Sequence, residues 1–155
     1  MCGGCKVLVK EMTLLSREEF KKYKSLIPET MQWWWLKSPA ISYQHDVYSV
    51  DYVNDVCIDG CYDRDGGVRP LCIFSLDSTE STFWCKSEKL IGSKIKYGKY
   101  NWTVLNSEYG EIYALCDEVV VKHRFDKDTN IWDNSELKIL LETAVLEMIT
   151  IQRGQ

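Results

Sequence analysis

The sequence lacks any long apolar run. Its 155 residues contain no stretch approaching the roughly 18–20 consecutive apolar residues that a membrane-spanning helix needs. The opening segment at residues 1–6 is not followed by the apolar region of a secretory signal peptide. We therefore expect a cytoplasmic protein with no membrane partner.

The chain also lacks an excess of positive charge. The chain has 19 Lys and Arg residues against 23 Asp and Glu residues, a net charge of −4 at neutral pH. Proteins that neutralise phosphates need a basic face, and the sequence shows none. We expect no direct binding of nucleic acid, and a basic protein partner is easier to accommodate.

Catalytic signatures are missing as well. The sequence contains no Gly-rich phosphate loop, no nucleophile elbow and no paired-histidine metal motif. A catalytic cysteine needs a neighbouring base, and the chain has two histidines, His45 and His123, that no motif brings to a particular cysteine. We predict that the protein is not an enzyme and needs no cofactor.

The seven cysteines have two interpretations. An odd number, in a compartment that keeps thiols reduced, argues against a disulfide framework. The spacings Cys2-x-x-Cys5 and Cys57-x-x-x-Cys61 offer four thiolates to a structural zinc ion, and separate free thiols are the alternative. The other three lie in strand-like apolar contexts and are expected in the core: Cys72, Cys85 and Cys116.

What the chain does have is enough apolar and aromatic material for one packed domain. Its length is that of a single domain, and 45% of its residues are hydrophobic. Six Trp and nine Tyr make it richer in aromatic rings than most chains. We expect a core built from some of these rings and a binding surface built from others.

Local patterns predict strands with one helix near each end of the chain. Ser16 and Glu19 form a capping box for a helix that ends before Pro28. Asp133 or Asn134 is expected to cap a second helix, in which apolar residues recur every three or four positions from Leu137. Strands are expected at residues 6–15, 31–36, 47–53, 68–74 and 111–122, with hairpins at 56–62, turning at Asp59-Gly60, and at 94–105.

Two short motifs resemble a family of bacterial and phage domains of unknown function. WWLKSP at residues 34–39 and GVRP at residues 67–70 are similar to the family's WWLRSP and GVRP signature. Relatives of that family share the C-type-lectin-like fold of formylglycine-generating-enzyme-like proteins and of diversified phage receptor-binding proteins. The resemblance implies a C-type-lectin-like α+β fold of mostly antiparallel strands with two helices. The cysteines that formylglycine-generating relatives use find no match, so their activity does not carry over.

The order of the two halves departs from the family pattern. Residues 91–141, including IKYGKYNWTVL at 95–105, resemble the opening of the same domain, yet they come second here. This predicts one circularly permuted domain over residues 1–155, with halves at 1–76 and 83–150 joined by a polar connection at 75–82. Because the same order lets two chains exchange halves, the expected state is a monomer or a half-swapped homodimer.

The interval between the two motifs is the candidate binding surface. Tyrosines interspersed with short polar residues are typical of adaptable recognition surfaces. In the diversified phage proteins this interval carries the ligand-binding positions, which the resemblance implies here too. An acidic, solvated hairpin without a partner is the alternative. The candidate partner-binding residues are Tyr43, His45, Asp46, Tyr48, Tyr52, Asn54, Asp55, Asp59, Tyr62 and Asp63.

The motif residues themselves are expected to be structural. Trp34 is predicted to pack in the core. Arg69 is predicted to stack on a tryptophan and to donate hydrogen bonds to loop carbonyls, rather than to contact a ligand.

These observations lead to one functional hypothesis and two alternatives. The first is a non-enzymatic protein-binding module, encoded by a phage or mobile element, that presents an acidic, tyrosine-rich surface to a protein partner. Alternatively, the acids imitate a phosphate track and inhibit a basic nucleic-acid-binding defence protein such as a CRISPR effector. The second alternative is a zinc-stabilised structural protein.

Overall fold

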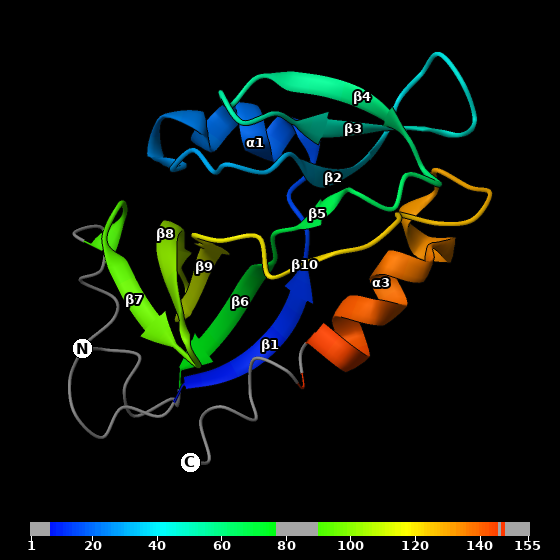
Figure 1. The fold of residues 1–155 in the computed structure, drawn as a ribbon. Coiled ribbons are helices and arrows are strands. Elements are labelled where there is room, and N and C mark those ends of the chain that lie inside the picture. The colour runs from blue at the N-terminus through cyan, green and yellow to red at the C-terminus, as the bar shows by residue number, and fades with distance from the viewer. Residues whose placement is uncertain (1–6, 77–89, 146, 148–155) are drawn as a thin grey trace.

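The computed structural model describes residues 7–76, 90–145 and 147 (Figure 1). Within these residues the strands form two five-stranded sheets. Sheet A has the order β1-β6-β9-β8-β7, with β1 at Val7–Thr13, β6 at Leu71–Leu76, β9 at Glu111–Cys116, β8 at Tyr100–Glu108 and β7 at Lys94–Tyr97. Sheet B has the order β10-β5-β2-β3-β4, with β10 at Val121–Lys122, β5 at Gly67–Val68, β2 at Trp34–Pro39, β3 at Asp46–Val50 and β4 at Val56–Gly60.

Each sheet combines strands from both halves of the chain. In sheet A, β6 pairs with β1 on one side and with β9 on the other, and both pairings are antiparallel. In sheet B, the short strand β10 pairs with β5, while β5 and β2 make the one parallel pairing among the described strands. The prediction of a mixed fold with mostly antiparallel strands is therefore confirmed.

The two α-helices of the described residues pack against different sheets. Helix α1 (Arg17–Tyr23) starts at the predicted capping box, in which Ser16 and Glu19 satisfy each other's backbone N–H groups, and continues into the 3-10 turn Lys24–Leu26. Helix α3 (Glu136–Leu140) follows the 3-10 turn Trp132–Asn134 and leads into a π-helical turn at Leu141–Val145. In Figure 1, α1 lies against sheet B and α3 lies beside β1. No helix in the described part of the chain is long and apolar enough to cross a membrane.

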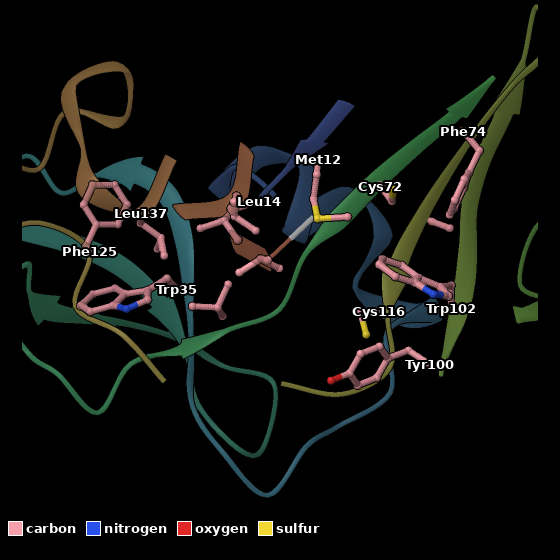
Figure 2. Packing of buried hydrophobic residues seen from close by; sticks show 14 of the residues in the cluster. Met12, Leu14, Trp35, Cys72, Phe74, Tyr100, Trp102, Cys116, Phe125 and Leu137 are labelled. Atoms are coloured by element: carbon pink, nitrogen blue, oxygen red, sulfur yellow. The ribbon is translucent and has the colours of Figure 1, made fainter. Parts of the chain in front are cut away.

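The buried residues form two clusters. The larger one runs from Trp35, Phe125 and Leu137 to Phe74 and Trp102, and so links sheet B and α3 to sheet A (Figure 2). The smaller one lies under α1 and includes Phe20 and Trp34, whose rings meet edge to face at 5.7 Å. The predicted burial of Trp34, Cys72 and Cys116 is confirmed, whereas Cys85 lies outside the described residues.

Three local predictions are wrong. Asp59-Gly60 does not turn a hairpin, because β4 continues through both residues and pairs along its length with β3. The strand expected at residues 68–74 is broken at Arg69-Pro70, where the chain passes from sheet B to sheet A. The second helix is capped by Ser135, whose side chain accepts from the Lys138 backbone, because residues 132–134 already form a 3-10 turn.

Candidate binding surface

The predicted surface coincides with the β3–β4 hairpin at the edge of sheet B. In this hairpin Asp46 lies opposite Gly60 and Val50 lies opposite Val56. A five-residue strand is about 17 Å long, so residues beyond its two ends are well separated. The hairpin therefore divides the candidate residues between its turn and its open end.

The turn end of the hairpin is held by the Asp51 side chain and by two contacts to residues 24–27. The Asp51 carboxylate accepts hydrogen bonds from the backbone N–H groups of Val53 and Asp55 at 2.9 and 3.0 Å. Asn54 has a left-handed φ of 59°, and its buried Nδ2 donates to the Ile27 carbonyl at 2.8 Å. Asp55 lies 3.5 Å from the Lys24 ammonium. Asn54 thus fixes the turn, and Tyr52 is the exposed ring at this end.

Tyr48 lies in the middle of the hairpin. Its ring is half-buried beneath the Arg17 guanidinium of α1, 4.6 Å from the ring centre. This cation–π contact joins β3 to α1. Tyr48 therefore offers a partner less of its ring than the exposed tyrosines do.

The open end of the hairpin meets a loop from the second half of the chain. Asn130 is buried, and its Nδ2 donates to the carbonyls of Tyr43 and Asp46 at 3.1 and 2.9 Å. The Cys61 carbonyl accepts from the N–H groups of Phe125 and Asp126 at 2.9 and 3.1 Å. Three loops are thereby joined, at residues 40–46, 60–63 and 125–130.

A histidine adds a further link between the same loops. The ring Nδ1 of His45 lies 2.6 Å from the Asp128 carbonyl, and because a carbonyl only accepts, this nitrogen carries the proton. The His45 carbonyl in turn accepts from the Cys61 N–H at 2.6 Å. His45, predicted to bind a partner, therefore also braces the loops.

Three large side chains project from these joined loops. Ile41 is 91% exposed, Tyr43 71% and Tyr62 61%. The Tyr62 ring lies over Gly60, where an added Cβ would come within 2.7 Å of it. We name the region the hairpin-end surface. It comprises Ile41, Tyr43, His45, Asp46, Asp59, Tyr62, Asp63 and Asp128, and the buried Asp126 adjoins it.

Carboxylates gather around these rings. Burial raises the pKa of Asp59, and the negative charges of Asp63 and Asp46 raise it further. A hydrogen bond from the Ser49 hydroxyl at 2.7 Å acts in the opposite direction and lowers this pKa. Burial, followed by the charge of Asp126, also raises the pKa of the Cys61 thiol. Acids of both halves of the chain thus act on the Cys61 thiol. Lys127 is an exposed cation in the same loop.

Asp126 organises the loop from the second half. Its carboxylate accepts from the backbone N–H groups of Asp128, Thr129 and Glu136 at 2.9, 3.0 and 2.9 Å. Burial alone raises the pKa of this carboxyl, but the three N–H groups and the nearby Arg124 outweigh burial, so the pKa is lowered. One charged side chain thus supports both the loop and the start of α3.

Replacing Asp126 with Asn is expected to destabilise the fold by about 1–3 kcal/mol, because the carboxamide replaces one accepting oxygen with a donor. A carboxyl whose pKa is lowered by folding stabilises the protein above its unfolded pKa, and this contribution is lost as pH falls through the folded pKa. Urea unfolding of both proteins should therefore show a gap at neutral pH that narrows in acid. A gap unchanged between pH 7 and pH 3 would contradict this role.

The two predicted zinc ligands in the described residues, Cys57 and Cys61, differ in burial. Cys57 is exposed on β4, and Cys61 is fully buried in the larger core cluster. Burial first, and then Asp51 at 3.7 Å, raise the pKa of Cys57 and so favour the thiol over the thiolate that zinc requires. Cys2 and Cys5 lie outside the described residues. Among the described residues no group of three or more His, Cys, Asp or Glu side chains is arranged to hold a metal ion.

Comparison with known protein families gives a match in the first half of the chain. Residues 6–76 match a family described as Domain of unknown function (DUF6273). The match covers just under half of the chain and includes both tryptophan-rich and GVRP motifs. No curated protein and no solved structure matches significantly.

The DUF6273 match ends before three residues that sequence reasoning missed. Asp126, Asp128 and Asn130 lie more than sixty positions after the candidate interval. Asn130 has no local signal of its own, because its hydrogen-bond partners come from the other half of the chain.

Proposed function

We propose that the chain is a non-enzymatic protein-binding module that contacts its partner through the hairpin-end surface. One observation carries the proposal: Ile41, Tyr43 and Tyr62 are exposed on two loops that Asn130 and Cys61 join to a third. Large exposed rings on a fixed backbone bind with little loss of conformational entropy. The turn end of the hairpin, held by contacts to residues 24–27, offers Tyr52 as an exposed tyrosine.

The charges around these rings indicate the chemistry of the partner. Asp46, Asp59 and Asp63 come from the first half of the chain, and Asp126 and Asp128 from the second. Complementary charge speeds association and excludes wrong partners more than it adds affinity. We infer a protein partner with a basic surface around an apolar contact. Within the chain, the acids repel one another, and association with such a partner relieves that repulsion.

The double variant Y43A/Y62A tests the proposal. Interface tyrosines often contribute at least about 2 kcal/mol each, so partner recovery should fall by more than about tenfold. The measurement is quantitative mass spectrometry after affinity purification from the native host, with far-UV circular dichroism to show that the fold is intact. The matched control Y52A, an exposed tyrosine at the other end of the hairpin, should capture the partner as the wild type does.

Two outcomes of this experiment oppose the proposal. Equal recovery by Y43A/Y62A and the wild type would rule out the hairpin-end surface as the contact. Loss with Y52A alone would place the contact at the turn of the hairpin instead.

A narrower function is favoured by the carboxylates of Asp46, Asp59, Asp63 and Asp128. If the acids imitate phosphates, as in an inhibitor of a CRISPR effector or another nucleic-acid-binding protein, the partner's own nucleic acid should displace the chain from it. Persistence of the complex in the presence of excess nucleic acid would contradict this candidate and leave the broader proposal standing.

We also infer that the fold is a circularly permuted relative of the C-type-lectin-like domains. The inference rests on the two motifs, whose strands pair in parallel at Trp34 and Gly67 and whose Arg69 stacks on Trp34. Both sheets need strands from each half, so a half-swapped dimer would preserve the same pairings.

A further inference from the structure

We propose that this protein has a second site, separate from the hairpin-end surface, that binds a phosphate group on a small molecule. The site is a cavity of about 330 Å³ lined by Arg64, Lys122, His123, Arg124 and Glu136. We name it the basic depression. Protein binding at the hairpin-end surface does not depend on the basic depression, so an experiment can contradict either proposal without affecting the other.

Cations from two distant parts of the sequence meet in this depression. Arg64 belongs to the loop that precedes β5, and Lys122 belongs to β10, which pairs with β5 through Gly67. Arg124 follows two residues later, and Glu136 is the first residue of α3. Three cationic side chains thus surround one carboxylate in a chain whose overall net charge is negative.

The carboxylate is already engaged by one of these cations. Arg124 holds Glu136 with Nε at 3.0 Å and Nη2 at 3.0 Å, a two-pronged contact that orients the guanidinium on the wall of the depression. Arg64 and Lys122 are exposed, and neither makes an ion pair with any described residue. Within the described part of the chain, two positive charges therefore lie on a concave surface without an ion-pair partner, and there their fields add.

The backbone beneath the depression is rigid. The Trp35 indole N–H donates to the His123 carbonyl at 2.8 Å, and the His123 N–H donates to the Gly66 carbonyl at 2.9 Å. The His123 ring donates through Nδ1 to the Arg124 carbonyl at 2.7 Å, which fixes its orientation. The cations are thus anchored on a preformed frame, and ligand binding does not have to order the backbone.

The charges select a phosphate group as the ligand. A guanidinium offers a planar fork that matches phosphate oxygens, and a lysine ammonium adds a mobile point charge. A phosphate carries more negative charge than a single carboxylate, so it matches the two unpaired cations better. The group can come from a free inorganic phosphate or from a phosphate ester, because both present the same oxygens.

Isothermal titration at low ionic strength tests the site with three probes: inorganic phosphate, inorganic pyrophosphate and glycerol 3-phosphate. We expect wild-type protein to bind at least one of them and R64E/K122E to bind it at least about tenfold more weakly, because two charged hydrogen-bond donors are lost. The control K96E/K99E carries the same change in net charge on the β7–β8 hairpin and should bind as the wild type does. Both altered lysines of the control are exposed.

The probes also distinguish the sources of the phosphate. Tighter binding of inorganic phosphate or pyrophosphate assigns the depression to free ions, and tighter binding of glycerol 3-phosphate assigns it to phosphate esters. The proposal is overturned if the wild type binds none of the probes, or if R64E/K122E binds as well as the wild type. If both double variants bind the probe equally weakly, the loss comes from the change in net charge alone, and the proposal is overturned as well.

Discussion

Replacing Arg69 with alanine is expected to lower the free energy of unfolding by about 3–5 kcal/mol. Arg69 is fully buried, and its guanidinium lies 4.9 Å from the centre of the Trp34 ring. Its Nε donates to the Cys116 carbonyl at 2.7 Å, and its Nη2 donates to the Asp117 carbonyl at 3.3 Å. The substitution removes a side chain that joins the two sheets and leaves a cavity and an unpaired carbonyl.

The side chain remains a cation in this environment. Burial lowers the pKa of Arg69 to about 10, while Cys116 and Asp117 oppose the shift, so the group is still protonated at neutral pH. Its Nη1 is buried without a hydrogen-bond partner among the described residues, which offsets part of what the other contacts contribute.

Arg69→Met is the matched control for this prediction, because it keeps much of the volume and removes the donors. Chemical denaturation of both variants should show a smaller loss for methionine than for alanine, and the difference measures the cavity. An alanine variant within about 0.5 kcal/mol of the wild type, the range of ordinary surface changes, would show that Arg69 does not brace the sheets.

Gly66→Ala should destabilise the protein by about 3 kcal/mol or more. A Cβ at this position would lie 2.0 Å from the Nε1 atom of Trp35 and 2.2 Å from its Cε2 atom. The indole has no room to move, because it is fully buried, contacts the rings of Trp33 and Phe125, and donates to the His123 carbonyl. Thermal or urea unfolding measures the loss.

Two further variants separate crowding from a general effect of losing glycine. Gly60→Ala meets the exposed Tyr62 ring, which can rotate away, and should therefore cost less than about 1 kcal/mol. Trp35→Phe removes atoms that crowd Gly66, so the double variant G66A/W35F should lose less stability than the two single losses combined. Additive losses would argue against the steric explanation.

Local chemistry explains which elements were predictable. The capping box at Ser16 and Glu19 and the hairpin at β7–β8 depend on residues close together in the sequence, and both are confirmed. The Asp59-Gly60 turn failed because β3 offered a pairing partner over the full length of β4. Asp133 and Asn134 failed as caps because Ser135, directly after them, accepts from the Lys138 N–H.

The candidate site was predictable only in part. The interval between the two motifs does form an edge hairpin, and Tyr43, Tyr52 and Tyr62 are exposed on it. Which residues lie together was not predictable, because the hairpin separates Tyr52 from Tyr43. The contributions of Asp128 and Asn130 require hydrogen bonds that span more than eighty positions, and Asp126 donates through its N–H to the Cys61 carbonyl of the other half.

The sequence by itself determined that this is a mixed α and β chain with Trp34 in its core, because helix caps, strand alternation and turns depend on neighbouring residues. It also determined that Arg69 is structural, through its place in a motif beside tryptophans. Only the tertiary structure decided the order of strands in two shared sheets, the hairpin-end surface and the basic depression. Each of these brings together groups far apart in the chain, and local propensities carry no information about such distances.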